Sequence, residues 1–133
     1  MTVRQAKEET MSWEREIADG FSSEEVASVE QAQEGVLLSC TDERYQWTGR
    51  VQIVLGGTRS RDDVIGVIED VFRDRDGYAV QRRQDTGDLR VLVSGPDGSA
   101  FVGRYDEETH LVNVASASRC VALAEDESPL DAF

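Results

Sequence analysis

The stretch that decides the fold is Tyr45-Gln46-Trp47-Thr48-Gly49-Arg50-Val51-Gln52-Ile53-Val54-Leu55. Large apolar residues alternate with polar ones through most of it, which is the period of a β-strand. An alternation of this length predicts that one face of the strand packs on a core while the other mostly meets water. Gly49 falls on the packed face. We therefore expect another element to approach it closely, with the helix carrying Trp13 as the candidate.

A helix is predicted ahead of this strand, over residues 3–19, and Gly20 is expected to end it. Its apolar stripe has the three- and four-residue spacing of a helix face, with members Val3, Ala6, Thr10, Trp13 and Ile17. The charged residues of the same segment are assigned to the solvent-exposed face of the helix: Glu8, Glu9, Glu14, Arg15 and Glu16.

A second helix is predicted after the strand. Ser60 is a suitable N-cap, and Asp62 and Asp63 would stand in the first turn, where the helix dipole favours negative charge. Its apolar face comprises Val64, Val67, Ile68, Val71 and Phe72. Asp76-Gly77 is expected to stop this helix.

The remaining segments predict short strands joined by tight loops, at residues 26–29, 36–40, 78–84, 89–94, 100–105 and 111–117. Short loops favour antiparallel pairing. The fold class is therefore α+β: a single, mostly antiparallel sheet with two helices packed on one face, in the order α-β-β-(β)-α-β-β-β-β. Residues 1–124 form the predicted domain, and the acidic residues 125–133 are expected to be a flexible C-terminal tail.

The composition limits the partners. The chain has 133 residues and a net charge of −13, from 14 basic and 27 acidic side chains. This balance argues against nucleic acid and against an anionic membrane surface, both of which select basic proteins. It permits a basic protein partner, or simply high solubility. No apolar run is long enough for a transmembrane helix.

Cys40 and Cys120 are the only cysteines, and each lies at the end of a predicted strand. They are predicted to form one disulfide that joins the two halves of the domain; two buried free thiols are the alternative. A bridge closing a loop of this length stabilises by roughly 4 kcal/mol in the chain-entropy model. It would indicate an oxidising compartment. Because residues 1–17 lack an export signal, the chain is either cytoplasmic or a mature form, and the disulfide favours the second.

Candidate chemistry is sparse. His110 is the only histidine, and we expect it in a surface loop. No catalytic residue, metal ligand or cofactor site is predicted, and the chain is expected not to be an enzyme. One possible anion site is formed by Gly57, Thr58, Arg59 and Ser60, where backbone N–H groups at a helix start could hold a negative charge. A plain turn and helix cap is the alternative.

Five motifs recur in an order that resembles a group of small exported proteins and lipoproteins of actinobacteria. They are Leu38-Ser39-Cys40, Tyr45-Gln46-Trp47-Thr48-Gly49, Asp76-Gly77-Tyr78, Gly95-Pro96-Asp97-Gly98, and Ala115-Ser116-Ala117-Ser118 with Cys120. The resemblance covers roughly residues 5–124. It implies a domain of the cell envelope with paired cysteines, and a lipid anchor upstream of the domain. It implies no known reaction.

Together these observations predict a non-enzymatic, extracytoplasmic interaction or ligand-binding domain, monomeric or weakly dimeric, that displays a sheet face or edge to an unknown protein or small ligand. The alternative is a cytoplasmic, acidic immunity or inhibitor protein whose charge matches a basic partner. A small enzyme that uses a concavity of the sheet is a third hypothesis.

Overall fold

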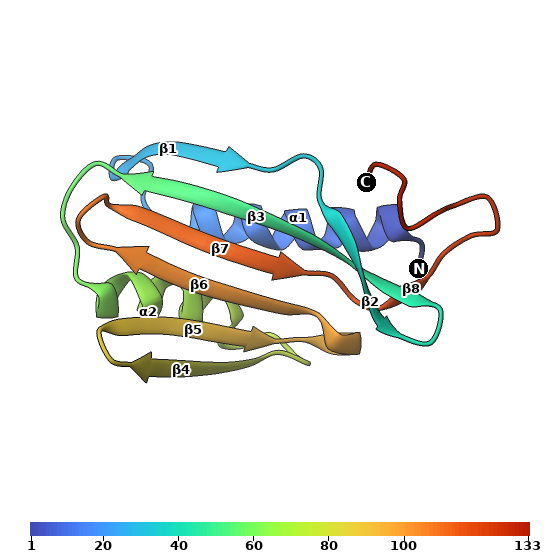
Figure 1. Ribbon diagram of the computed structural model, residues 1–133. Helices are drawn as coiled ribbons and strands as arrows, with labels where there is room; N and C mark the ends of the chain where they lie inside the picture. The colour runs from blue at the N-terminus through green and yellow to red at the C-terminus, as the bar shows by residue number, and fades with distance from the viewer.

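The computed structural model describes residues 1–133 and contains two α-helices and one eight-stranded antiparallel sheet (Figure 1). The predicted α+β class and order of elements are confirmed. In chain order the elements are α1 (Val3–Asp19), β1 (Val26–Gln31), β2 (Val36–Thr41), β3 (Arg44–Leu55), α2 (Arg61–Phe72), β4 (Ala79–Asp85), β5 (Asp88–Ser94), the 3₁₀ turn η1 (Pro96–Gly98), β6 (Ala100–Asp106), β7 (Leu111–Ala117) and the short β8 (Val121–Ala122).

Strand β3 is the hub of the sheet. The main path runs β1-β3-β7-β6-β5-β4, while β2 and β8 also pair with β3. One edge of β3 therefore carries β1 and β2 in succession, and the other carries β7 and β8. Its buried side chains alternate as the sequence predicts, with members Trp47, Val51, Ile53 and Leu55.

Both helices begin at side-chain caps. The Thr2 hydroxyl accepts a hydrogen bond from the backbone N–H of Gln5, and the Gln5 side chain accepts one from the N–H of Thr2, at 3.1 and 2.9 Å. The Ser60 hydroxyl accepts from the N–H of Asp63 at 3.1 Å. These bonds satisfy backbone donors that the first helical turn leaves free. Helix α2 ends at Phe72, before the predicted stop at Asp76-Gly77.

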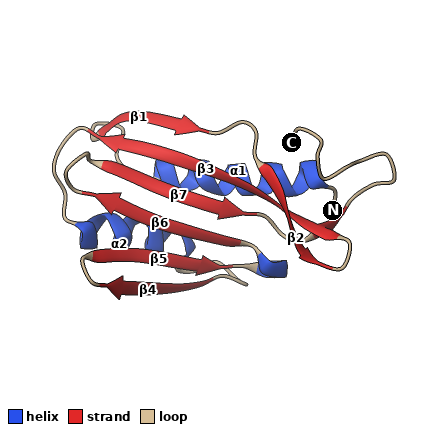
Figure 2. Cartoon of the chain, in the orientation of Figure 1, coloured by secondary structure: helices blue, strands red, loops and turns tan.

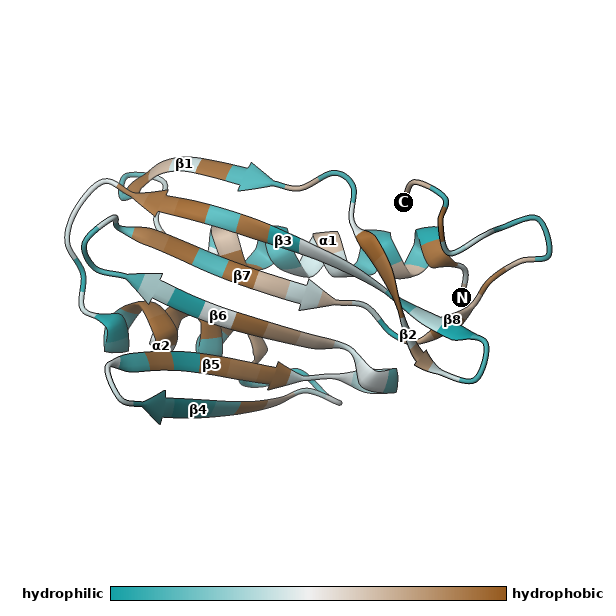
Figure 3. Cartoon of the chain, viewed as in Figure 1, coloured by the Kyte–Doolittle hydropathy of each residue, from teal (hydrophilic) through white to brown (hydrophobic).

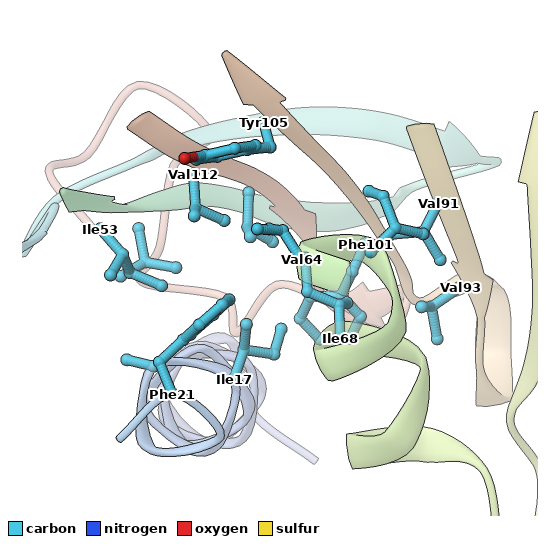
Figure 4. Packing of buried hydrophobic residues seen from close by; sticks show 14 of the residues in the cluster. Ile17, Phe21, Ile53, Val64, Ile68, Val91, Val93, Phe101, Tyr105 and Val112 are labelled. Carbon is cyan, nitrogen blue, oxygen red and sulfur yellow. The ribbon is translucent and has the colours of Figure 1, made fainter. Parts of the chain in front are cut away.

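The two helices cover the same side of the sheet (Figure 2). Between them and the strands lies a cluster of 17 buried apolar residues, here called the larger cluster. Figure 4 shows side chains from both helices meeting side chains from the strands. Its members are Ile17, Ala18, Phe21, Val51, Ile53, Leu55, Val64, Ile65, Ile68, Phe72, Leu89, Val91, Val93, Phe101, Tyr105, Val112 and Val114.

A second cluster of seven buried residues lies at the end of the molecule where α1 begins. It comprises Val3, Ala6, Met11, Leu37, Trp47, Val121 and Phe133. The indole Nε1 of Trp47 donates a hydrogen bond to the carbonyl of Phe133 at 3.0 Å. Most of residues 125–132 are exposed, but the predicted tail ends in a packed side chain.

The assignment of Glu14 to the solvent-exposed face of α1 is wrong. Its side chain is fully buried against the sheet. Ser116 on β7 donates a hydrogen bond to one carboxyl oxygen at 2.7 Å, and the Gln31 amide on β1 donates to the other at 3.0 Å. These two donors satisfy a polar group that would otherwise be costly to bury.

The close neighbour of Gly49 also differs from the prediction. The indole of Trp47, two residues earlier on β3, lies over Gly49, and a Cβ there would overlap that ring. The glycine makes room for the aromatic side chain of its own strand, rather than for the helix carrying Trp13. Trp13 instead packs against Phe72 and Tyr78, with ring centroids 4.7 and 4.9 Å away.

Candidate functional site: the open face of the sheet

The predicted disulfide is present. Cys40 and Cys120 are 80 residues apart in sequence, and their Cα atoms are 6.3 Å apart. Cys40 lies at a register shift in β2, and Cys120 directly precedes β8. Because β2 and β8 pair with opposite edges of the start of β3, the bond links the two segments that enclose this end of the strand.

Several motif segments converge around this bond. The side-chain amide of Gln46 donates to the carbonyls of Gly98 and Ser118, at 2.7 and 3.0 Å. The backbone N–H of Cys120 donates to the carbonyl of Asp97 at 2.9 Å. The backbone N–H of Trp47 donates to the Ser118 hydroxyl at 2.8 Å. These contacts give the motif residues a structural task, which is to fix the loops around the disulfide.

The residues of the possible anion site already have partners. One guanidinium nitrogen of Arg59 contacts both carboxyl oxygens of Glu25, at 3.1 and 3.2 Å. Ser60 caps α2, and Asp62 and Asp63 place two negative charges in its first turn. Gly57 and Thr58 remain exposed. Anion binding at this loop stays a prediction, and we build no function on it.

Neither a metal centre nor a histidine-based site takes shape. Nowhere does the chain bring three or more His, Cys, Asp or Glu side chains together in a group that could hold a metal ion. His110 lies in the turn between β6 and β7 with a positive φ of 60°, a conformation that non-glycine residues adopt mainly in turns.

The sheet face opposite the helices, here called the open face, is covered by neither helix. Figure 1 looks onto this face, with both helices behind the sheet. Residues directly opposite one another in paired strands point to the same face. The register therefore arranges the exposed side chains in rows that cross the strands.

One part of the open face is apolar. Leu92 lies opposite Val102, and Val102 lies opposite Ala115. In the neighbouring row Ala117 lies between Ala100 and Thr48, and the row continues to β2. We call this surface the apolar band; its members are Val36, Leu38, Leu92, Ala100, Val102, Ala115 and Ala117. Val36 and Leu38 are 63% and 54% exposed, and β2 is strongly apolar in Figure 3.

The next row along the strands is basic. Arg83 on β4 lies opposite Arg90 on β5, which in turn lies opposite Arg104 on β6. We call these three residues the arginine row. Arg90 forms an ion pair with Asp85 at 3.0 Å, whereas Asp88 stands 3.6 Å from Arg90 and 3.8 Å from Arg104. Arg83 takes part in no ion pair.

The open face is electrically distinct from the rest of the chain. The rows that run from β1 to β4 carry four arginines and four carboxylates, namely Arg50, Arg83, Arg90 and Arg104 with Glu30, Asp85, Asp88 and Asp106. Their charges cancel, so the net charge of −13 belongs entirely to the other surfaces of the molecule.

Comparison of the chain with protein-family models, with curated proteins and with solved structures gives no match. Neither helix is long and apolar enough to cross a membrane. The candidate site therefore rests on the geometry of the open face.

Sequence reasoning proposed that a sheet face or edge would be displayed, but it missed the arginine row. A signal for part of it was present in the hairpin that joins β4 to β5. Asp85 and Asp88 pair across Thr86-Gly87, a connection typical of tight hairpins with glycine in the loop. That turn fixes the register, and the register sets Arg83 opposite Arg90.

Proposed function

We propose that this chain is a non-enzymatic, extracytoplasmic binding domain, and that the open face of its sheet receives the partner. The observation that carries the proposal is the apolar band, which crosses several strands on the face that no helix covers. Three of its members are exposed and four are half-buried. Antiparallel sheets commonly leave one face in water, but such a face is usually polar. Contiguous exposed apolar surface is a mark of interaction sites.

The shape of the band suits a flat contact. Its centre is made of short side chains, Ala100, Ala115 and Ala117, with Leu92 and Val102 rising beside them. Another sheet, or an extended segment, can approach such a surface closely because few side chains have to move aside. The longer Val36 and Leu38 border it on β2, where they meet solvent at a sheet edge.

The disulfide supports the compartment in this proposal. Bonds of this kind persist in oxidising environments and are rare where thiols are kept reduced. Thiol titration of native, unreduced protein from its own cells tests this part. We expect Cys40 and Cys120 to be unreactive until a reductant is added, and two freely reactive thiols would contradict an extracytoplasmic location.

The binding surface can be tested with a photoreactive amino acid placed at one position at a time. At Val102, in the apolar band, we expect a discrete cross-linked product in the cells that produce the protein. At Ser12, exposed on α1, we expect none. Equal products from both positions, or product from Ser12 alone, would contradict the assignment of the binding surface to the open face.

A second candidate function rests on a different surface. Between the C-terminal ends of the two helices, Glu16, Asp19, Asp70 and Asp74 line a shallow pocket with Arg75. This acidic surface favours an inhibitor or immunity protein that binds a basic partner. The same cross-linking experiment separates the two candidates, because a reporter at Asp70 would then give the product instead of one at Val102.

A further inference from the structure

We propose that the arginine row is the specificity element of the open face, and that it binds carboxylates on an acidic, partly apolar segment of a partner protein. This inference rests on the proposed function, because it names the chemistry of the partner received by the open face.

The charge arrangement of the row is unfavourable on its own. Like charges directly opposite one another in paired strands destabilise a sheet, and here three guanidinium groups from neighbouring strands share one row. Arg90 and Arg104 share Asp88, at 3.6 and 3.8 Å, and Arg90 also pairs with Asp85, whereas the exposed Arg83 forms no ion pair. The Nε–H of Arg90 is buried and has no hydrogen-bond acceptor. A carboxylate of a partner could pair with the exposed guanidinium of Arg83 and reduce the repulsion within the row.

The spacing of the row suits several carboxylates at once. Neighbouring strands lie about 5 Å apart, and each guanidinium can bind a carboxylate through two parallel hydrogen bonds. The ion pair of Arg90 with Asp85 joins a half-buried side chain to an exposed one. Exposed pairs of this kind contribute little stability, so they can exchange with carboxylates of a partner at small cost.

The rest of the molecule restricts what kind of anion can reach the row. A chain with a net charge of −13 repels long polyanions such as nucleic acid and highly charged polysaccharide, and it also repels an anionic bilayer. A short acidic segment avoids most of that repulsion. The adjoining apolar band, with Leu92 and Val102 beside the row, requires apolar side chains as well. A protein segment that combines carboxylates with apolar residues satisfies both surfaces.

The probe that tests this inference is a fluorescent synthetic peptide in which glutamate alternates with leucine, titrated with the full chain at physiological salt. We expect saturable binding by the wild type. The double variant Arg83→Glu, Arg104→Glu is expected to bind at least about tenfold more weakly, as charge reversal of close interfacial pairs does. The matched control Arg4→Glu, Arg73→Glu changes the net charge equally at exposed positions of α1 and at the end of α2 and should bind like the wild type.

The outcomes separate this inference from the function on which it rests. If the leucines of the peptide are replaced by serine and affinity falls, the apolar band is engaged; unchanged affinity would overturn the proposed function. If reversal of the arginine row leaves affinity unchanged while leucine dependence remains, only the present inference fails.

Tighter binding of heparin or of anionic vesicles than of the peptide would overturn the inference in favour of a polysaccharide or lipid partner. Absence of peptide binding would also overturn it. Far-ultraviolet circular dichroism verifies that both double variants are folded.

Discussion

The two buried clusters are built differently. The larger cluster joins both helices to four strands through side-chain packing among 17 buried residues. The second cluster has seven, and it is fastened by the Cys40–Cys120 bond and by the hydrogen bond from Trp47 to Phe133. Small cores bury too little apolar surface to hold together by packing alone, and cross-links commonly compensate. The larger cluster is therefore stabilised mainly by buried apolar surface. The second cluster is stabilised to a greater extent by its disulfide and by the hydrogen bond from Trp47.

Helix α1 belongs to both clusters. Val3, Ala6 and Met11 from its first half lie in the second cluster, while Ile17 and Ala18 lie in the larger one. Glu14 falls between them, hydrogen-bonded to strands on the other side of the interface. A buried polar group at the border means that the apolar core is not continuous along the helix.

The largest effect is expected in the larger cluster. Phe72 is fully buried and stacks among Trp13, Tyr78 and Phe101. Replacing it with alanine removes its contacts and leaves a cavity, so we expect Phe72→Ala to lower the free energy of unfolding by about 4 kcal/mol. Urea denaturation measures the loss. Val67→Ala, at a half-buried position on the same helix, should lower the free energy of unfolding much less. Equal losses would show that the centre of the larger cluster contributes no more than its edge.

Removal of the disulfide is expected to rank next. The chain-entropy value is an upper figure, and measured bridges typically give less, so the double variant Cys40→Ala, Cys120→Ala should lose about 3 kcal/mol. Hydrogen exchange should show the amides around Trp47 losing protection before those around Ile68. If both regions lose protection together, the disulfide does not stabilise the second cluster more than the larger one.

A third test adds one methyl group to the second cluster. Because a Cβ at position 49 would overlap the indole of Trp47, Gly49→Ala should cost about 2 kcal/mol through overpacking. Gly57→Ala is the matched control, since no heavy atom lies within 4 Å of a Cβ built there. Thermal unfolding of both variants measures the difference. Comparable losses would show that Trp47 has room to move.

The smallest effect is expected at the border residue. Burial raises the pKa of the Glu14 carboxyl, although hydrogen bonds from Ser116 and Gln31 and the charge of Arg15 offset part of the rise. Because the folded pKa lies above the unfolded one, stability is greatest below the unfolded pKa and falls as the pH rises through the folded pKa. Glu14→Gln should remove this fall, so the variant should gain stability relative to the wild type as the pH rises.

Denaturation of wild type and Glu14→Gln across the range from acidic to neutral pH tests that expectation. The two curves should approach one another at low pH and separate as the pH rises. If they run parallel over the whole range, the carboxyl of Glu14 ionises in the folded state as easily as in the unfolded one.

Much of this architecture could be predicted because it depends on local pattern. Alternation marks β3, capping residues mark both helices, and short glycine-containing turns mark the hairpins. The errors have another origin. The helix period shows only which residues are apolar, so it assigns Glu14 to solvent, while Gln31 and Ser116, which donate hydrogen bonds to Glu14, come from distant strands. The sequence does not indicate that Trp47 is the close neighbour of Gly49, because the rotamer of Trp47 is set by tertiary packing.

The candidate site was less predictable for the same reason. Alternation within β5 and β6 shows that Arg90 and Arg104 share the exposed face with Leu92 and Val102. Their alignment into rows depends on strand order and on the register across each pair. A two-residue turn fixes that register for Arg83 and Arg90, but the loop between β5 and β6 contains η1, whose geometry a sequence pattern does not give.

The central position of β3 has a consequence for how the protein is made. One edge of β3 pairs with β1 and β2, which precede it in the chain. Its other edge pairs with β7 and β8, which are synthesised much later. While the ribosome is adding the residues between them, the nascent chain carries a long apolar strand with an unpaired edge, the kind of template that recruits other strands. The sheet can close only after β7 and β8 have emerged, so the nascent chain is exposed to aggregation until then.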